Sequence, residues 1–119
     1  MRLLGSQQIG IDIVKIERFR EKKIFENQSF YEKIFTKSEI SYCKRFIDPY
    51  PHFAGKFALK EAIQKSINEN LIFNKIETFH SNSRPKIKLE GSKEKYKFVI
   101  SISHENEYAI AIALSKKEN

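Results

Sequence analysis

The sequence is poor in the residues that mark several common protein classes. Its 119 residues contain one cysteine, three prolines, four glycines and no tryptophan. The lone Cys43 can form no intramolecular disulfide and no cysteine zinc site, so a reducing cytoplasm is the expected compartment. No apolar run approaches the roughly 20 residues of a membrane-spanning helix, and the first residues are too polar for a signal-peptide core. We therefore expect a cytoplasmic protein with no membrane segment.

What the sequence does contain indicates a folded, basic protein. Hydrophobic residues make up 40% and charged residues 31%, a balance that argues against a disordered or collagen-like chain. The length fits a single domain over residues 1–119. The 22 Lys and Arg exceed the 15 Asp and Glu, for a formal net charge of +7. Such a charge favours a polyanionic or acidic partner, whether nucleic acid, a phosphorylated ligand or an acidic protein.

The hydrophobic pattern predicts an α+β fold, with helices mainly first and antiparallel strands mainly last. Helical spacing predicts a short basic helix from residue 15 to about 23 and a long central helix, packed on the sheet, from about 52 to 68. Thr36 and Glu39 form a Thr-x-x-Glu capping box that begins a further helix, which residues 48–51 end. Period-two alternation predicts strands at 8–14, 75–80, 86–89, 98–103 and 108–114, the last four as two hairpins.

Asp12 is the first candidate for chemistry. It lies in the isoleucine-rich strand at 8–14, on the same face as Gly10. A carboxylate near a glycine, where a ligand can approach the backbone, can hold a hard cation. The alternative is a solvent-facing strand position, because an alternating strand normally exposes one polar face.

Glu61 and Lys65 are the second candidate. They lie one helical turn apart in the central helix, so both can address one ligand. The alternative is a surface ion pair, which would contribute only about 0.2–0.5 kcal/mol. Glu61 also neighbours Phe57 and Ala58 on the helix surface, near the apolar stripe, and this position weakens the surface-pair interpretation.

The tip of the last hairpin, residues 101–104, is the third candidate. Its serine hydroxyls, backbone N–H groups and the His104 imidazole could bind a phosphate. The alternative is a solvated turn histidine. We interpret His52 and His80 as structural residues and Cys43 as a packing residue.

Three segments together resemble one known family. They are residues 9–14 (IGIDIV), 53–65 (FAGKFALKEAIQK) and 99–104 (VISISH). In order and spacing they resemble the small type of 4′-phosphopantetheinyl transferase, the holo-[acyl-carrier-protein] synthase family. The likeness extends over nearly the whole chain. Two departures are Lys56, where the family often has Arg, and Ser83-Arg84-Pro85, in place of a Gly-Lys-Pro or Gly-Arg-Pro turn.

This resemblance implies an activity and a set of site residues. The expected enzyme moves the phosphopantetheine arm of coenzyme A onto a serine of apo acyl carrier protein, with Mg²⁺, and releases adenosine 3′,5′-bisphosphate in support of fatty acid biosynthesis. Asp12 and Glu61 would be the metal ligands, and Glu61 and Lys65 the catalytic residues. Lys65, a metal-bound water and Glu61 all stay open as the general base. The expected coenzyme contacts are Lys56, Lys60, Lys65, Ser103 and His104.

The resemblance also implies protein partners. An acidic carrier protein would dock on the basic segment after the Asp12 strand, although a solvated helix face is the alternative. A homotrimer with active sites at subunit boundaries is expected, and the strand at 109–114 has apolar residues on both faces, as a strand buried in an assembly would. The residues expected to dock the carrier are Arg18, Arg20, Lys22 and Lys23.

Two competing interpretations explain less. A small basic nucleic-acid-binding module would use the +7 charge and the aromatic residues, but it gives no reason for Asp12 and Glu61. A non-catalytic scaffold of the same fold would not need both carboxylates and Lys65. We therefore expect an enzyme without a nucleic-acid partner.

Overall fold

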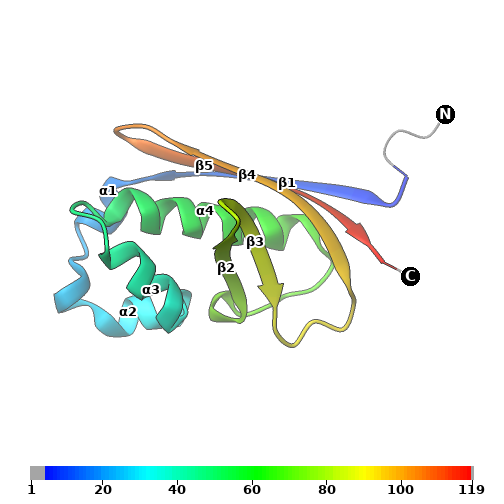
Figure 1. The fold of residues 1–119 in the computed structure, drawn as a ribbon, viewed down its shortest axis with the longest axis horizontal. Coiled ribbons are helices and arrows are strands. Elements are labelled where there is room, and N and C mark those ends of the chain that lie inside the picture. Colours follow the sequence, from blue (N-terminus) through cyan, green and yellow to red (C-terminus); the bar gives the residue numbers. More distant parts are fainter. Residues whose placement is uncertain (1–4, 119) are drawn as a thin grey trace.

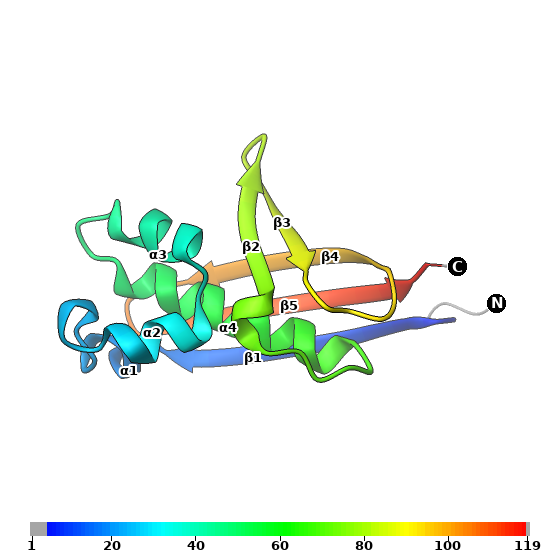
Figure 2. The same cartoon turned by 90° about the horizontal axis from the view of Figure 1, so that it is seen from below.

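The computed structural model describes residues 5–118 and places the helices on one face of a three-stranded antiparallel sheet (Figure 1). The strand order is β1-β5-β4, so β1 and β4 form opposite edges. A second, two-stranded sheet is a hairpin beside the first (Figure 2). The strands are β1 (Gln7–Lys15), β2 (Ile76–Ser81), β3 (Arg84–Leu89), β4 (Tyr96–His104) and β5 (Tyr108–Lys117). The predicted α+β class and antiparallel pairing are confirmed.

The helical elements differ from the predictions at their ends, and the helix at Gln28–Ile34 was not predicted. The helix that begins with the capping box ends at Lys44, earlier than the predicted end at residues 48–51, and residues 50 and 51 belong to the next helix. The predicted basic helix at 15–23 is a single turn, and the predicted helix at 52–68 begins earlier, at Tyr50. Pro49 is its N-cap and Pro51 lies in its first turn, where proline is tolerated because that N–H has no partner within the helix. The elements are α1 (Glu17–Arg20), η1 (Ile24–Glu26), α2 (Gln28–Ile34), α3 (Lys37–Lys44), α4 (Tyr50–Ser66) and η2 (Phe73–Lys75).

Small residues on the inner face of the sheet let α4 lie close to β1 and β5. Ala109, Ala111 and Ala113 of β5 are buried under the helix. On β1, a Cβ atom added to Gly10 would lie 1.9 Å from the backbone oxygen of Ala62. Glycine is needed there for space, not for its backbone freedom. The close approach brings the α4 side chains near Ala62 directly against β1.

An aromatic cluster fixes α1 and α2 against α4. Phe19, Tyr31 and Phe53 are almost completely buried, and the rings of Tyr31 and Phe53 lie 4.7 Å apart. The Tyr31 hydroxyl donates to the carbonyl oxygens of Phe19, at 3.1 Å, and Lys22, at 2.7 Å. These aromatic residues therefore serve the core, as their spacing in the sequence indicates.

The outer face of the sheet is apolar and exposed in the single chain. Ile9, Ile11 and Ile13 are 62%, 54% and 60% exposed, and Val99 is 70% exposed. Asp12 shares the inner face with Gly10 as predicted, and its alternative interpretation as a solvent-facing residue is wrong, because the isoleucines face outward. An exposed apolar surface of this kind marks an interaction site.

Two predicted local motifs are present. The capping box of α3 has both reciprocal bonds: Glu39 N–H donates to Thr36 Oγ1, and Thr36 N–H donates to Glu39 Oε1. The β2–β3 turn uses Asn82 and Ser83 with φ of 53° and 62°, as a two-residue type I′ hairpin turn requires. No helix within residues 5–118 is long and apolar enough to cross a membrane.

Candidate active site

Asp12 and Lys65 meet where α4 crosses β1. The Asp12 side chain is only 18% exposed because it faces the helix. The Lys65 ammonium group lies 3.2 Å from Asp12 Oδ1 and donates to the carbonyl oxygen of Ile11 at 3.0 Å. Lys65 itself remains exposed, so part of its ammonium group can reach a ligand from solvent. The first strand packs beside the central helix, as predicted.

Glu61 lies one turn before Lys65 and adds a second carboxylate to this corner. Partial burial raises the pKa of Glu61, and the negative charge of Asp12 raises it further. The charges of Lys65 and Arg18 act in the opposite direction. Two carboxylates that repel each other beside a solvent-accessible surface would gain from a cation between them.

The donor set fits Mg²⁺. This ion is usually held by one or two carboxylates, with phosphate oxygens and waters filling the other positions. Asp12 and Glu61 supply the two carboxylates. Within residues 5–118 there is no group of three or more His, Cys, Asp or Glu side chains placed to hold a metal. Two carboxylates alone would leave the other positions around such an ion to phosphate oxygens and waters.

A second polar site lies at the opposite edge of the sheet, on the β4 side of α4. It is a hollow of about 240 Å³ between α4, β4 and the β2–β3 hairpin, which we call the histidine pocket. His52 and His104 lie with ring centroids 5.5 Å apart, and His80 stacks on Tyr42 at 5.2 Å. Lys56 also lines the hollow. Imidazole and ammonium groups around one hollow are suited to a phosphate.

The residues of the histidine pocket shift the pKa values of two of its histidines. Burial lowers the pKa of His52, and the nearby His104 lowers it further. Partial desolvation beside α4 also lowers the pKa of His80, although its side chain stays largely exposed, and the charge of Lys56 is the second cause. An anionic ligand would oppose these effects, because it favours the charged imidazolium form.

The predicted coenzyme contacts fall into different places. His104 and Lys56 line the histidine pocket, although the Lys56 ammonium group also donates to Thr78 Oγ1 at 2.8 Å and to its carbonyl oxygen at 3.1 Å. Ser103 is exposed and pairs with Ile110, which places it on the outer face of β4. Ser103 and His104 of one chain therefore point to opposite faces of the strand.

The prediction for Lys60 is wrong. Its side chain is fully buried, and its ammonium group donates to Glu39 Oε1 at 2.6 Å and to the carbonyl oxygens of Ile34 and Phe73 at 2.9 and 2.8 Å. An ammonium group has three N–H donors, and all three are used inside the protein. Lys60 has no donor left for a coenzyme phosphate.

His52 and His80 are the residues that sequence reasoning missed. Both line the histidine pocket, whereas nothing in the sequence distinguishes them from structural histidines. One signal was present: His52 lies one turn before Lys56 on the same face of α4. His80 had no comparable signal, because the fold of the hairpin brings it there. The interpretation of Cys43 as a packing residue agrees with its burial, which raises the pKa of its thiol to about 12.

The basic segment after β1 borders a hollow of about 430 Å³. Arg18 and Lys22 line it together with Phe30 and Phe57, and Arg18 lies 5.5 Å from the centre of the Phe57 ring. Arg20 is engaged elsewhere, in a 2.6 Å contact with Asp48. Lys23 lies over the Tyr50 ring at 5.4 Å. Of the four predicted docking residues, Arg18 and Lys22 are therefore the ones at this hollow.

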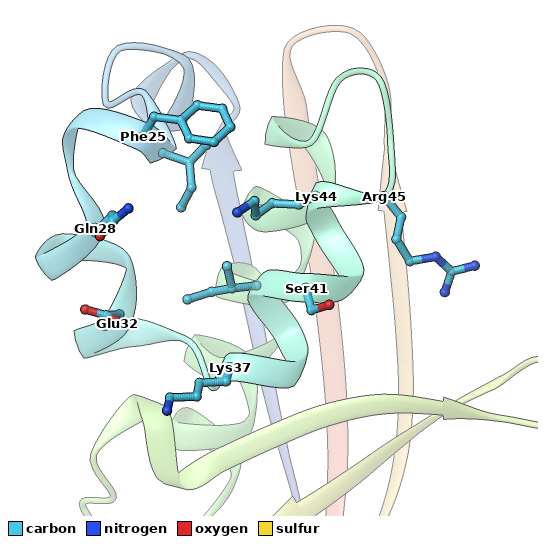
Figure 3. Close-up of a pocket in the computed structure, with 9 residues that line it drawn as sticks. Phe25, Gln28, Glu32, Lys37, Ser41, Lys44 and Arg45 are labelled. Carbon is cyan, nitrogen blue, oxygen red and sulfur yellow. The ribbon is translucent and has the colours of Figure 1, made fainter.

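Another hollow, of about 450 Å³, lies between α2 and α3 (Figure 3). Phe25 and Lys44 lie toward one end and Lys37 toward the other. None of the predicted site residues lines it. Volume alone therefore does not mark the place where the carboxylates and the histidines gather.

Residues 8–113 match the 4′-phosphopantetheinyl transferase superfamily. The chain belongs to the 4′-phosphopantetheinyl transferase superfamily. This membership confirms both the resemblance and the predicted enzyme class. The matched residues include all of β1 except Gln7 and the whole of α4 and β4, so they contain both polar sites.

Relatives of this phosphopantetheinyl transferase chain match along almost their full length. A holo-[acyl-carrier-protein] synthase of Thermodesulfovibrio yellowstonii is 40% identical over 111 residues, which are 89% of this chain and 95% of that protein. The Helicobacter pylori holo-[acyl-carrier-protein] synthase in complex with coenzyme A is 36% identical, with a TM-score of 0.76 over 91% of this chain and 99% of the other. The Bacillus anthracis synthase in complex with CoA (3′,5′-ADP) is 30% identical, with a TM-score of 0.75 over 93% and 96%.

Proposed function

We propose that this protein transfers the 4′-phosphopantetheine group of coenzyme A to a serine of an apo acyl carrier protein and releases adenosine 3′,5′-bisphosphate. The observation that supports this proposal most strongly is that Asp12, Glu61 and Lys65 lie together where α4 meets β1. Relatives at 30–40% identity that are named holo-[acyl-carrier-protein] synthase support the same activity. A role in fatty acid biosynthesis and a cytoplasmic location follow as part of the proposal.

The proposed reaction concentrates negative charge at one place. The serine oxygen bonds to the phosphorus of the phosphopantetheine group, a general base takes the serine proton, and the P–O bond to the adenosine bisphosphate breaks. Glu61 and Lys65 are this chain's candidates for that base. Mg²⁺, when bound, neutralises charge on the pyrophosphate oxygens. Asp12 and Glu61 would hold it. Lys65 keeps Asp12 oriented through its ammonium group and adds positive charge beside the leaving group.

The histidine pocket is the proposed site for a phosphate at the adenosine end of the coenzyme. His104 and Lys56 were expected there from the sequence, and His52 and His80 join them in the structure. A phosphate monoester carries up to two negative charges, so it suits a hollow bordered by several cationic or proton-binding groups. Ser103 lies on the other face of β4, which a neighbouring subunit would cover in the trimer proposed below.

The hollow beside α1 is the proposed docking site for the carrier. It lies next to the carboxylate site, because Arg18 is close enough to lower the pKa of Glu61. The exposed Arg18 and Lys22 would attract an acidic protein, and Phe30 and Phe57 would give it an apolar contact. Lys23 can extend this surface, while Arg20 supports it through its contact with Asp48.

We further propose a homotrimer with shared active sites. The carboxylate site lies on the β1 side of α4 and the histidine pocket on the β4 side, at opposite edges of the sheet. A head-to-tail ring would bring the β1 edge of one subunit to the β4 edge of the next. The same ring would cover the exposed isoleucine face of the sheet, which burial would stabilise at about 25 cal/mol per Å².

The activity is tested by incubating the protein with coenzyme A, Mg²⁺ and an apo acyl carrier protein. The mass of the carrier should rise by one phosphopantetheine group, and a chelator should stop the rise. An unchanged carrier mass with several carrier proteins would contradict the proposed function.

Assembly is tested separately by light scattering and by mixing variants. We expect a trimer. Glu61→Gln and His104→Ala, each inactive alone, should regain partial activity when the two chains are unfolded and refolded together, because some sites then combine two intact halves. An active monomer, or no recovery in the mixture, would contradict the shared site.

A further inference from the structure

The β2–β3 hairpin brings four residues to the histidine pocket but shares no hydrogen-bonded ladder with the three-stranded sheet. Its contributions are Thr78, Phe79, His80 and Pro85. In Figure 2 the tip of the hairpin projects away from the rest of the chain, past β4. Along β2, Ile76 and Thr78 are buried, whereas Phe79, His80 and Ser81 are exposed. The place of His80 in the pocket therefore depends on how the hairpin is attached near Thr78.

Thr78 is attached through its backbone and its side chain at once. Its N–H donates to Glu39 Oε2 at 2.9 Å, and its hydroxyl donates to the same oxygen at 2.6 Å. Its carbonyl oxygen and its hydroxyl oxygen both accept from the Lys56 ammonium group. Side chains of α3 and α4 thus satisfy backbone groups that a neighbouring strand would satisfy in a larger sheet.

Glu39 is the centre of this attachment. Its side chain is fully buried and accepts four hydrogen bonds: two from Thr78, one from the Lys60 ammonium group and one from Thr36 N–H. Lys60 is fixed in turn by the carbonyl oxygens of Ile34 and Phe73. We call Glu39, Lys56, Lys60 and Thr78 the Glu39 cluster. It joins α2, α3, α4, η2 and β2 in one set of bonds.

The cluster is also balanced in charge. Two lysines, Lys56 and Lys60, face the buried Glu39 and the half-buried Glu77, which accepts from Thr36 and Ser38 hydroxyls. Burial lowers the pKa of both lysines, and Glu39 is the first group that opposes this effect. Within residues 5–118 no buried side-chain nitrogen or oxygen lacks a partner. A cluster that is satisfied in this way holds its members in one arrangement.

We propose that Glu39 is a positioning residue for coenzyme binding: through Thr78 it fixes the β2–β3 hairpin against α4 and so places His80 in the histidine pocket beside His52 and Lys56. Glu39 lines none of the hollows described above, so it acts only through the residues it holds. This inference rests on the proposed function, because it assigns the pocket to the coenzyme.

The test compares the full-length protein with Glu39→Gln, which keeps the size of the side chain and loses its charge. Tyr31→Phe is the matched control, because it removes one buried and one partly buried hydrogen bond, neither of which involves the hairpin. Coenzyme A affinity is measured by titration calorimetry, and backbone hydrogen exchange reports on each strand. Thr78→Val and Thr78→Ser form a second pair, in which only the serine keeps the bonding hydroxyl.

For Glu39→Gln we expect a coenzyme A Kd weaker by roughly tenfold, as for the loss of other supporting contacts around a binding site. Backbone hydrogen exchange should become faster in β2 and β3, whereas exchange in β4 and β5 should change little. Tyr31→Phe should leave the Kd within about twofold, and Thr78→Ser should bind better than Thr78→Val.

An unchanged Kd, or exchange that rises equally in every strand, would overturn the positioning role. If Glu39→Gln does not fold, the Thr78 pair decides: equal Kd values and equal exchange in its two members would overturn the inference. If the wild-type protein binds no coenzyme A, the proposed function fails. Hydrogen exchange then still decides whether Glu39 holds the hairpin.

Discussion

Two consecutive residues of α4, Lys60 and Glu61, lie in opposite environments. Lys60 is fully buried, and three acceptors satisfy its ammonium group. Glu61 is half-buried, and this burial together with the charge of Asp12 raises its pKa. Charged groups that the protein satisfies on its own serve the structure, whereas charged groups left in mutual repulsion are ready for an external cation.

The largest effect on stability is expected on the satisfied side of the helix. Lys60→Ala leaves the Glu39 carboxylate buried without its cation, so the free energy of unfolding should fall by about 3–5 kcal/mol. Urea unfolding followed by circular dichroism measures this change.

Lys65→Ala is the matched control, because Lys65 is a lysine of the same helix, five residues after Lys60. Lys65 is exposed, so removing its ion pair with Asp12 should cost less than about 1 kcal/mol. Similar losses for the two alanine variants would remove the distinction between the two sides of α4.

A smaller loss of stability is expected where β1 touches α4. Gly10→Ala places a methyl group against the backbone of Ala62, and helix and strand must separate, at a cost of about 1–3 kcal/mol. The separation should also lower transfer activity, since it moves Asp12 away from Glu61. Gly55→Ala is the control for stability only, because its new methyl group would meet only the Ile102 side chain, at 3.2 Å, and both residues line the histidine pocket. Equal losses of stability at the two glycines would contradict the close approach at Gly10.

The smallest effect is a pH dependence at Glu61. The folded metal-free protein holds the Glu61 proton more tightly than the unfolded chain does, because the pKa is raised. Its stability contribution is therefore lost as the pH rises from the ordinary glutamate value through the Glu61 pKa. Protons should likewise compete with Mg²⁺ at a higher pH than at an ordinary glutamate. A carboxyl titration by NMR should give a higher pKa still in Lys65→Met; a lower one would contradict the opposing role of Lys65.

Two local rules predict the faces on which the residues of the carboxylate site lie, whereas the family resemblance, and no local rule, pairs Asp12 with Glu61. Period-two alternation places Asp12 on the face of Gly10, and helical spacing places Glu61 one turn before Lys65. The capping box at Thr36 is equally local. These features depend on neighbours a few residues away, so tertiary packing did not alter them.

The remaining features depend on long-range packing. Helix α4 is buried on nearly all sides, so its hydrophobic pattern does not show which neighbour each side chain faces, and Lys60 was assigned to the wrong one. The bonds from Glu39 to Thr78 and the meeting of His80 with His52 join distant segments. The isoleucine face of β1 reads as a core face in the sequence, yet it is the exposed face of the single chain.

Glu61 is proposed to act in transfer, whereas its neighbour Lys60 supports the fold. The most direct measurement is the rate at which Glu61→Gln transfers phosphopantetheine at limiting Mg²⁺, with the mass of the carrier as the readout. The melting temperature of the same variant is measured alongside. We predict a loss of at least about 100-fold in rate, since a metal ligand should matter at least as much as a supporting residue. The melting temperature should stay the same or rise, because a repulsion is removed. Transfer at the wild-type rate by a folded Glu61→Gln protein would contradict the account.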